Sequence, residues 1–224
     1  MSRRLFDLSH EVPKVPTFAA GETFGRGAVL AYSDLAETKL AQTSLLAFSD
    51  HVSTHIDAPA HFHPGGKTID EMPPELFVEA PALWLDCSTK GPGEAIEPAE
   101  LERASEGAAG GISPGEAVLL YTGCSRRWGR PDYRRSLRPV APASVEWLLG
   151  RGVRLFGVDG PEIDSDPIGW PAHKLLRRHE FYIIENLALW PAVAELPRRF
   201  LLIAMPLALK GATAAPARVV AAAE

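Results

Sequence analysis

The strongest constraint on the fold is a series of short apolar segments, each bounded by Gly, Pro, Asp or Ser. Their length and their β-branched and aromatic content are typical of β-strands. The segments occupy residues 28–33, 43–48, 81–87, 117–122, 153–158, 181–184 and 200–209. Twenty prolines and nineteen glycines punctuate the 224 residues, yet no stretch is long and polar enough to be a disordered linker. We therefore predict a single domain over residues 1–224.

Three segments carry signals for α-helices instead. Residues 97–108 and 141–152 each begin with a proline in the first turn and end at glycines, and residues 170–180 also start with a proline. The last two predicted helices lie between predicted strands, which indicates at least one βαβ-like stretch. The sequence thus predicts an α/β fold with a mixed sheet and leaves the order of the strands open.

Charge and hydropathy exclude several classes of partner. The net charge is −5 and the isoelectric point is about 5.8, so neither a nucleic acid nor an anionic membrane is an expected partner. The densest basic clusters, Arg126–Arg127 and Arg134–Arg135, fall in a predicted loop and are interpreted as solvated surface. The sequence contains no apolar run of about 18 residues, so a transmembrane helix is not predicted.

The N-terminus and the cysteines bear on the cellular compartment. The first residues, MSRRLFDLSHEVPK, lack the apolar stretch of a secretory signal, so we expect no secretion. Cys87 and Cys124 are too few and too far apart to define a disulfide framework or a zinc knuckle. We therefore expect both thiols to be reduced and the protein to be cytoplasmic.

The segment most informative about function is SDHVSTHIDAPAHFH, residues 49–63. In an extended conformation the side chains alternate, and one face carries His51, Ser53, His55 and Asp57. In a helix, Asp57 would instead lie about 200° round from His55. The β-branched residues between the histidines also form helices poorly, and a proline two residues after Asp57 blocks a helix from continuing. We therefore predict an extended segment that gathers two imidazoles and a carboxylate on one face.

Two imidazoles and one carboxylate are the ligand set expected of a catalytic zinc or manganese site with an open coordination position. The alternative is a polar strand whose histidines are only hydrogen-bonded. Four of the seven histidines, at positions 51, 55, 61 and 63, lie within thirteen residues together with an aspartate. That density favours a metal site.

Residues 51–62, HVSTHIDAPAHF, resemble the His-x-Gly-Thr-His-x-Asp-x-Pro-x-His signature of the cyclase-like metal-dependent hydrolases, which include bacterial kynurenine formamidase and isatin hydrolase. Further segments resemble the family in the same order: FDLSH at 6–10, YTGCSRRWG at 121–129, GVDGPEID at 157–164, WPAHKLL at 170–176, IIENL at 183–187 and APARVVA at 215–221. The resemblance implies an α/β fold of the swivelling β/α type, with a mixed β-sheet or barrel-like core flanked by helices. It also implies a homodimer or homotetramer, with the loop 13–27 as a candidate for exchange between subunits.

The resemblance further implies two divalent metal ions, with zinc expected first and manganese as the alternative. The ligands that it implies are His51, His55, Asp57, His173 and Glu185. The first three would hold one metal, and Asp57 would bridge to a second metal completed by the last two. His61 would be the acid/base residue beside the metals. By spacing alone His173 is an ordinary helical histidine, whereas Glu185 ends an apolar run and needs a partner if it is buried.

Ser53 departs from the family pattern, because it stands where the signature has glycine. In the extended interpretation its side chain lies on the ligand face, where it would narrow the pocket or hydrogen-bond a substrate. Phe62, Trp128 and Trp170 are candidates for stacking on an aromatic substrate, with ordinary packing as the alternative. Asp159 is expected either to orient a ligand histidine or to form a turn.

The ligand set predicts the class of reaction. A bound divalent metal lowers the pKa of a coordinated water towards about 7 and polarises a carbonyl, so we predict a metal-dependent amidohydrolase in which His61 passes a proton to the leaving nitrogen. The sequence has neither a Gly-x-Ser-x-Gly elbow nor a nucleotide-binding glycine motif, so a serine hydrolase and a nucleotide cofactor are not expected. Three functions stay open: an arylformamidase acting on N-formyl-L-kynurenine, a hydrolase of isatin or another cyclic amide, and a non-catalytic metal-binding protein.

Overall fold

The computed structural model describes residues 3–12, 27–33, 36, 41–108, 110–166, 169–175 and 180–223. The strands are β1 (Arg4–Asp7), β2 (Gly27–Ser33), β3 (Thr43–Phe48), β4 (His55–Asp57), β5 (Ala80–Asp86), β6 (Ala117–Tyr121), β7 (Leu155–Val158), β8 (Tyr182–Glu185), β9 (Arg199–Pro206) and β10 (Ala214–Ala223). The α-helices are α2 (Pro98–Glu106), α3 (Pro142–Gly150) and α4 (Pro171–Leu175). Two of the short 3-10 helices, η1 (Pro59–His61) and η5 (Arg134–Ser136), contribute residues to the site described below.

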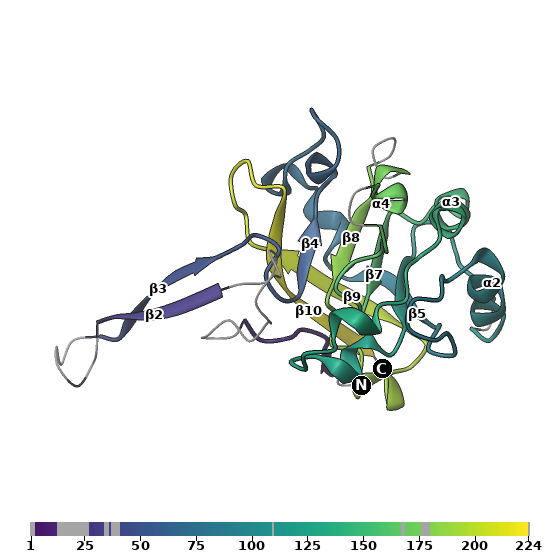
Figure 1. Cartoon of the computed structure of the whole chain (residues 1–224), viewed down its shortest axis with the longest axis horizontal. Helices are drawn as coiled ribbons and strands as arrows, with labels where there is room; N and C mark the ends of the chain where they lie inside the picture. Colours follow the sequence, from purple (N-terminus) through teal and green to yellow (C-terminus); the bar gives the residue numbers. More distant parts are fainter. Residues whose placement is uncertain are drawn as a thin grey trace.

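Seven of the strands close into a barrel (Figure 1). They follow the order β10-β4-β8-β7-β6-β5-β9, and β9 pairs with β10 to complete the ring. The closure depends on the length of β10, which has ten residues. Its first part pairs with β4 and its last part with β1, while β9 lies along its other side. Closing the ring satisfies strand edges that an open sheet would leave exposed.

The two halves of the barrel differ in strand direction. β5, β6, β7 and β8 run parallel, and α2, α3 and α4 connect them in three consecutive βαβ crossovers. The remaining neighbours in the ring pair antiparallel. The predicted α/β fold with a mixed, barrel-like core flanked by helices is therefore confirmed. The C-terminal ends of parallel strands meet at one edge, where α/β proteins commonly bind their ligands.

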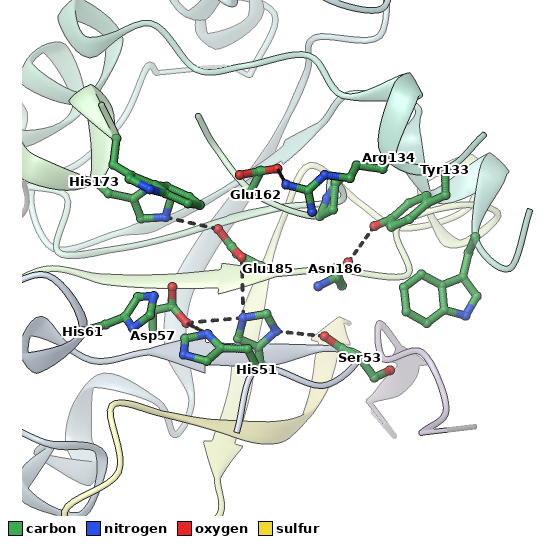
Figure 2. A pocket seen from close by; sticks show the side chains of 14 residues that line it. His51, Ser53, Asp57, His61, Tyr133, Arg134, Glu162, His173, Glu185 and Asn186 are labelled. Atoms are coloured by element: carbon green, nitrogen blue, oxygen red, sulfur yellow. Dashed lines mark hydrogen bonds and ion pairs between the residues drawn. The ribbon is translucent and has the colours of Figure 1, made fainter. Parts of the chain in front are cut away.

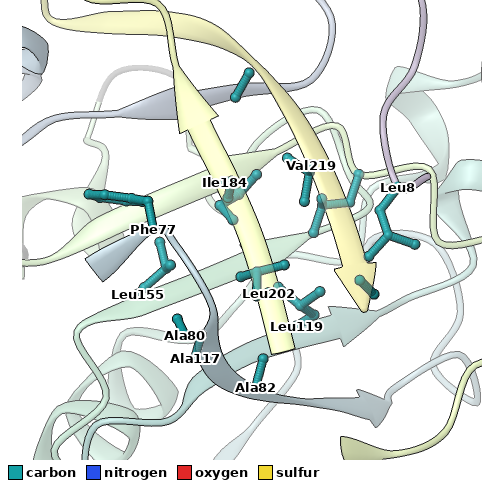
Figure 3. Packing of buried hydrophobic residues seen from close by; sticks show 14 of the residues in the cluster. Leu8, Phe77, Ala80, Ala82, Ala117, Leu119, Leu155, Ile184, Leu202 and Val219 are labelled. Atoms are coloured by element: carbon teal, nitrogen blue, oxygen red, sulfur yellow. The ribbon is translucent and has the colours of Figure 1, made fainter. Parts of the chain in front are cut away.

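One face of each strand fills the interior of the barrel (Figure 3). Leu119 and Ile184 are fully buried there, and small side chains occupy much of the remaining space. The small interior residues include alanines at 82, 117, 204, 215 and 221. At Gly157 a Cβ would lie 2.6 Å from Leu187 Cδ1 and 2.9 Å from Leu119 Cδ2, so only glycine fits without displacing its neighbours. The small residues allow short strands to close tightly around one another.

The opposite face of the parallel strands packs against the helices. Val118 and Phe156 form a second apolar cluster with Leu101 of α2 and Leu148 of α3. Residues of β8 alternate between the two clusters, since Ile184 lies in the barrel interior and Ile183 in the outer cluster. By the same alternation, the next residue, Glu185, points to the outer face. The barrel therefore presents polar residues of β8 and of its neighbour β4 beside α4.

β2 and β3 form a separate two-stranded sheet that projects from the barrel (Figure 1). On β3, Leu45 and Leu46 are each 56% exposed. A two-stranded ribbon has only marginal stability by itself, and adjacent exposed leucines are typical of an interaction surface. We refer to residues 27–33 and 43–48 as the β2–β3 arm.

All seven predicted strands and all three predicted helices correspond to elements of the structure. β1 and β10 lie outside the predicted strands, whereas β4 falls within the segment predicted to be extended. The loop 13–27 lies outside the described residues except for its last position, and so do residues 176–179 of the third predicted helix. Both cysteines are buried and free. Within the described ranges, no helix has the length and apolar character required to cross a membrane.

Candidate active site

The candidate site lies on the outer face of the barrel, where β4 meets β8. The two strands pair antiparallel with His55 opposite Glu185 and Asp57 opposite Ile183. Directly opposed residues bring their Cβ atoms within about 5 Å of each other. This register therefore joins the HVSTHID segment to a carboxylate that lies far away in the sequence.

The segment 51–57 is only partly extended, so that prediction is wrong for its first half. The strand comprises His55–Asp57, and the chain turns before it because Ser53 has a φ of +55°. The hydroxyl of Ser53 donates to the carbonyl oxygens of His10 (2.8 Å) and Glu11 (3.0 Å). A left-handed φ explains a glycine at this position in the family signature, since glycine adopts it without strain. Although Ser53 borders the pocket, its hydroxyl is engaged by the backbone.

Three imidazoles and two carboxylates converge on a small volume (Figure 2). Asp57 Oδ1 lies 3.0 Å from His51 Nδ1 and 3.3 Å from His55 Nε2. Glu185 links two histidines, with Oε2 3.5 Å from His55 Nε2 and Oε1 3.4 Å from His173 Nε2. All five predicted ligands are thus brought together in the structure.

The ligand atoms fall into two groups that share Asp57. Single atoms of His51, Asp57 and His61 lie within 4.8 Å of one another, and the same holds for His55, Asp57 and Glu185. Asp57 is common to both groups, in the position predicted for a bridging carboxylate. The groups differ from the predicted sets, since His61 lies with His51 while His55 lies with Glu185.

Three atoms of this cluster are buried and make no well-formed hydrogen bond, although each lies 3.0–3.5 Å from another group of the cluster: His55 Nε2, Asp57 Oδ1 and Glu185 Oε1. Buried polar atoms are nearly always hydrogen-bonded, because an unpaired one costs about 1–3 kcal/mol. Two acceptors and one imidazole nitrogen directed at the same region fit a divalent cation, which accepts a lone pair from each. The residues present therefore fit a metal site.

The convergence also shifts the pKa values of these groups. Burial acts to lower the pKa of His55, but hydrogen bonds and charge interactions with Asp57 and Glu185 raise it to about 10. Burial acts to raise the pKa of Asp57, but His51 and His55 hold that pKa well below its usual value. The cluster thus favours positive charge beside its carboxylates, which is the charge that a metal cation carries.

The ring nitrogens that face away from the cluster are fixed by oxygen atoms. His55 Nδ1 lies 2.9 Å from the carbonyl oxygen of Ser53, and His173 Nδ1 lies 2.6 Å from Asp164 Oδ2. Both histidines therefore direct Nε2 towards Glu185, the arrangement that supporting partners give to metal-binding histidines. Asp164 was not singled out from the sequence. Its partner, His173, lies nine residues later in the short helix α4. A separation of nine residues matches no local motif, so the sequence does not distinguish Asp164 from a surface aspartate.

His61 lies at the end of η1, beside His51. Their ring centroids are 4.1 Å apart, and His61 Nδ1 is 3.3 Å from Thr213 Oγ1. Burial is the main influence on the pKa of His61 and lowers it, so the imidazole is neutral near pH 7. A neutral imidazole at the edge of the cluster is able to take a proton from water and pass it on.

Aromatic side chains form part of the pocket wall. Trp128 stacks on His10 with ring centroids 4.0 Å apart, and Trp170 directs an edge contact to His173 at 5.1 Å. Both tryptophans line the pocket. Phe62 packs against the rings of His61 and His173, at 4.3 Å each, and is not itself among the residues that line the pocket.

A polar wall completes the pocket and was not anticipated. Arg134 Nη2 contacts Glu162 Oε1 at 2.5 Å, and both residues line the pocket. Arg134 is thus partly solvated, as expected, with its side chain 41% exposed, but it also belongs to the pocket, where it pairs with a buried carboxylate. Tyr133 donates its hydroxyl to Asn186 Oδ1 at 2.8 Å on the same side.

Asp159 has neither of its two predicted roles. Its buried carboxylate accepts hydrogen bonds from the backbone and hydroxyl groups of Thr122 (2.8 and 2.5 Å) and Ser125 (3.1 and 2.7 Å). A further bond comes from the backbone of Gly123 at 3.1 Å. Asp159 therefore anchors the loop after β6, whereas Asp164 orients the imidazole of His173.

Comparisons with known proteins agree with this geometry. A family model described as "Putative cyclase" matches residues 6–165. The kynurenine formamidase of Bordetella pertussis is 34% identical over 178 residues, which cover 79% of this chain and 78% of that protein. The kynurenine formamidase of Paracidovorax citrulli is 36% identical over 179 residues, again covering 79% and 78%.

Solved structures match over nearly the whole chain. Isatin hydrolase A from Labrenzia aggregata superimposes with a TM-score of 0.84 at 27% identity, covering 99% of this chain and 94% of that one. Isatin hydrolase A from Ralstonia solanacearum gives a TM-score of 0.83 at 28% identity, covering 99% and 92%.

Proposed function

Because the chain belongs to the Cyclase family, we propose that it is a metal-dependent amidohydrolase acting on an aryl formamide, with N-formyl-L-kynurenine as the substrate that gives formate and kynurenine. The observation that carries this proposal is the convergence of buried atoms of His55, Asp57 and Glu185 that make no well-formed hydrogen bond. A non-catalytic metal-binding protein is disfavoured by the neutral imidazole of His61 at the edge of the same cluster.

We propose that His51, His55, Asp57, His173 and Glu185 hold divalent metal, with Zn²⁺ expected first and Mn²⁺ as the alternative. Asp57 is suited to bridge two ions because it belongs to both ligand groups. When bound, the metal supplies a Lewis acid for the amide carbonyl and lowers the pKa of water.

In the proposed reaction His61 moves the proton. Its neutral ring takes a proton from the attacking water, whose oxygen bonds to the amide carbon. The C–N bond then breaks, and His61 returns the same proton to the departing nitrogen. An aryl amine needs that proton because the nitrogen leaves poorly as an anion. The contact between His61 Nδ1 and Thr213 leaves Nε2 for this exchange.

A cyclic amide such as isatin is the second candidate substrate. The likeness to isatin hydrolase A over nearly the whole chain supports it, since ring opening of a lactam uses the same attack on a carbonyl carbon. The higher identity to kynurenine formamidases, 34–36% against 27–28%, favours the formamide.

We also propose a homodimer or homotetramer that works in the cytoplasm. The exposed leucines of the β2–β3 arm support self-association, because they would be covered in an oligomer. The two buried, free cysteines are consistent with a reducing compartment.

The test is hydrolysis by purified protein loaded with zinc or manganese, with metal content measured. Wild-type protein should release formate from N-formyl-L-kynurenine, and His55→Ala should abolish release. His63→Ala is the matched control, because this exposed histidine of the same segment lies outside the ligand groups. Hydrolysis of isatin but not of N-formyl-L-kynurenine would indicate that the enzyme acts on cyclic amides. If a metal-loaded protein hydrolyses neither compound, both proposed substrates are refuted.

A further inference from the structure

The polar wall of the pocket contains an ion pair that the proposed chemistry does not use. Glu162 is only 7% exposed, and its Oε1 contacts Arg134 Nη2 at 2.5 Å. The second oxygen, Oε2, is buried without a hydrogen-bond partner. Figure 2 shows the pair on the other side of Glu185 from His61. The pair is therefore placed to contact the part of a substrate that does not react.

Glu162 has an unmet requirement for a positively charged or hydrogen-donating partner. A buried carboxylate oxygen without such a partner loses hydration that nothing replaces. Burial accordingly raises the pKa of Glu162 to about 7, and the nearby charge of Arg134 only partly opposes this rise. An ammonium group beside Oε2 would supply both a hydrogen-bond donor and a positive charge to this oxygen.

Arg134 is able to bind the opposite charge, that of a carboxylate. Its guanidinium carries five N–H donors, and the side chain remains 41% exposed beside the pocket. The contact with Glu162 uses Nη2 and holds this end of the guanidinium at the pocket. A guanidinium edge is well suited to bind a carboxylate through two parallel hydrogen bonds.

A carboxylate site next to an ammonium site matches the two charges on the α-carbon of an amino acid. We infer that Arg134 and Glu162 bind the α-carboxylate and the α-ammonium of a zwitterionic amino-acid substrate, and so select such substrates over uncharged aryl amides. This inference rests on the proposed function for the position of the reacting amide. It narrows the substrate class, since isatin and simple formanilides carry neither charge.

The first test measures binding, so that it does not depend on turnover. Metal-loaded protein is titrated by calorimetry with L-kynurenine and with 2-aminoacetophenone, which keeps the aryl ketone and lacks the amino-acid group. We expect L-kynurenine to bind at least about tenfold more tightly, the size of one charge-assisted interaction. Arg134→Gln should remove this preference without changing the affinity for 2-aminoacetophenone. Equal affinities in the wild type, or no binding of L-kynurenine, would overturn the inference.

Two further variants separate recognition from stability. Arg134→Lys keeps a positive charge beside Glu162 but loses the planar fork, so it should fold normally and lose part of the preference. Arg135→Gln removes the adjacent, exposed arginine and should keep the full preference. A purely structural ion pair would leave the binding preference intact in every folded variant.

A parallel assay distinguishes this inference from the proposed function. N-formyl-L-kynurenine and 2-formamidoacetophenone share the same scissile amide and differ only in the amino-acid group. Equal kcat/KM for both would support the amidohydrolase and overturn the role of Arg134 and Glu162. Binding selectivity without hydrolysis of either compound would support that role and refute the formamidase.

Discussion

The substitution Asp164→Asn tests whether His173 is a metal ligand held in place by its neighbour. Asp164 Oδ2 accepts hydrogen bonds from the backbone N–H (2.9 Å) and from Nδ1 (2.6 Å) of His173, while Oδ1 accepts from the backbone N–H of Ala172 (2.9 Å). Burial acts to raise the pKa of Asp164, yet these bonds lower it, so the group is charged at neutral pH. Asparagine has almost the same shape but only one acceptor oxygen.

The expected loss of metal affinity follows from the number of acceptor oxygens, two in aspartate and one in asparagine. In the variant, the amide NH₂ must face either Ala172 or His173, and both positions hold donors. If the NH₂ faces His173, the imidazole loses the bond that fixes Nε2 towards Glu185. Partners of this kind are worth about 10- to 100-fold in metal affinity. We therefore expect the metal dissociation constant to rise by about that factor, or about 1.4–2.8 kcal/mol.

The assay is competition for metal against a chromophoric chelator, with circular dichroism to confirm folding. Asp132→Asn is the matched control, because this carboxylate pairs with Arg127 at 2.9 Å on the surface, where both side chains are 48% exposed. A folded Asp164→Asn protein that binds metal as tightly as the wild type would show that His173 is not a ligand or needs no orientation.

Three other perturbations have defined outcomes. Removing metal with a chelator should lower the melting temperature, because metal bound only by the folded state stabilises it by mass action; an unchanged melting temperature would contradict the site. Burial is the main cause that lowers the pKa of His10 to about 4, so the unfolded chain takes up its proton near pH 6.5 and the folded protein does not. Stability should therefore fall between pH 6.5 and 4, and His10→Gln should show a smaller fall in urea titrations across that range. Gly157→Ala should lower the free energy of unfolding by about 1–3 kcal/mol, because its Cβ would overlap Leu187 and Leu119; full stability in chemical denaturation would refute the packing described.

The fold was predictable where a strand is apolar and β-branched, and less so elsewhere. β10 was missed although it is the longest strand, because its sequence AAPARVVAAA is rich in alanine, which strands normally disfavour. Its alanines are required by the narrow interior of the barrel, a tertiary constraint that local propensity does not contain. β4 comprises only the last three residues of the segment predicted to be extended, His55–Asp57, because the chain turns at Ser53.

The candidate site was predictable to the extent that its residues share one motif. His51, His55 and Asp57 follow from a local pattern, whereas Glu185 required the resemblance to the family. Arg134 and Glu162 could not be found, because each is an ordinary charged residue in a loop until the fold brings the two together. Their contact depends on the loops after β6 and β7 meeting at the C-terminal edge of the parallel strands.

Ser53 shows how a ligand segment tolerates a departure from its family pattern. The position requires a φ of +55°, which costs a serine about 1 kcal/mol or more relative to glycine. Its hydroxyl has a single proton and offsets that strain with one hydrogen bond shared between the carbonyl oxygens of His10 and Glu11, worth about 1 kcal/mol. The carbonyl of Ser53 at the same time accepts from His55 Nδ1 and so helps to orient that imidazole. The serine therefore joins the N-terminal segment to residues 53–55 through a hydroxyl and a carbonyl that already have partners, and we expect it to affect rigidity of the site more than substrate choice.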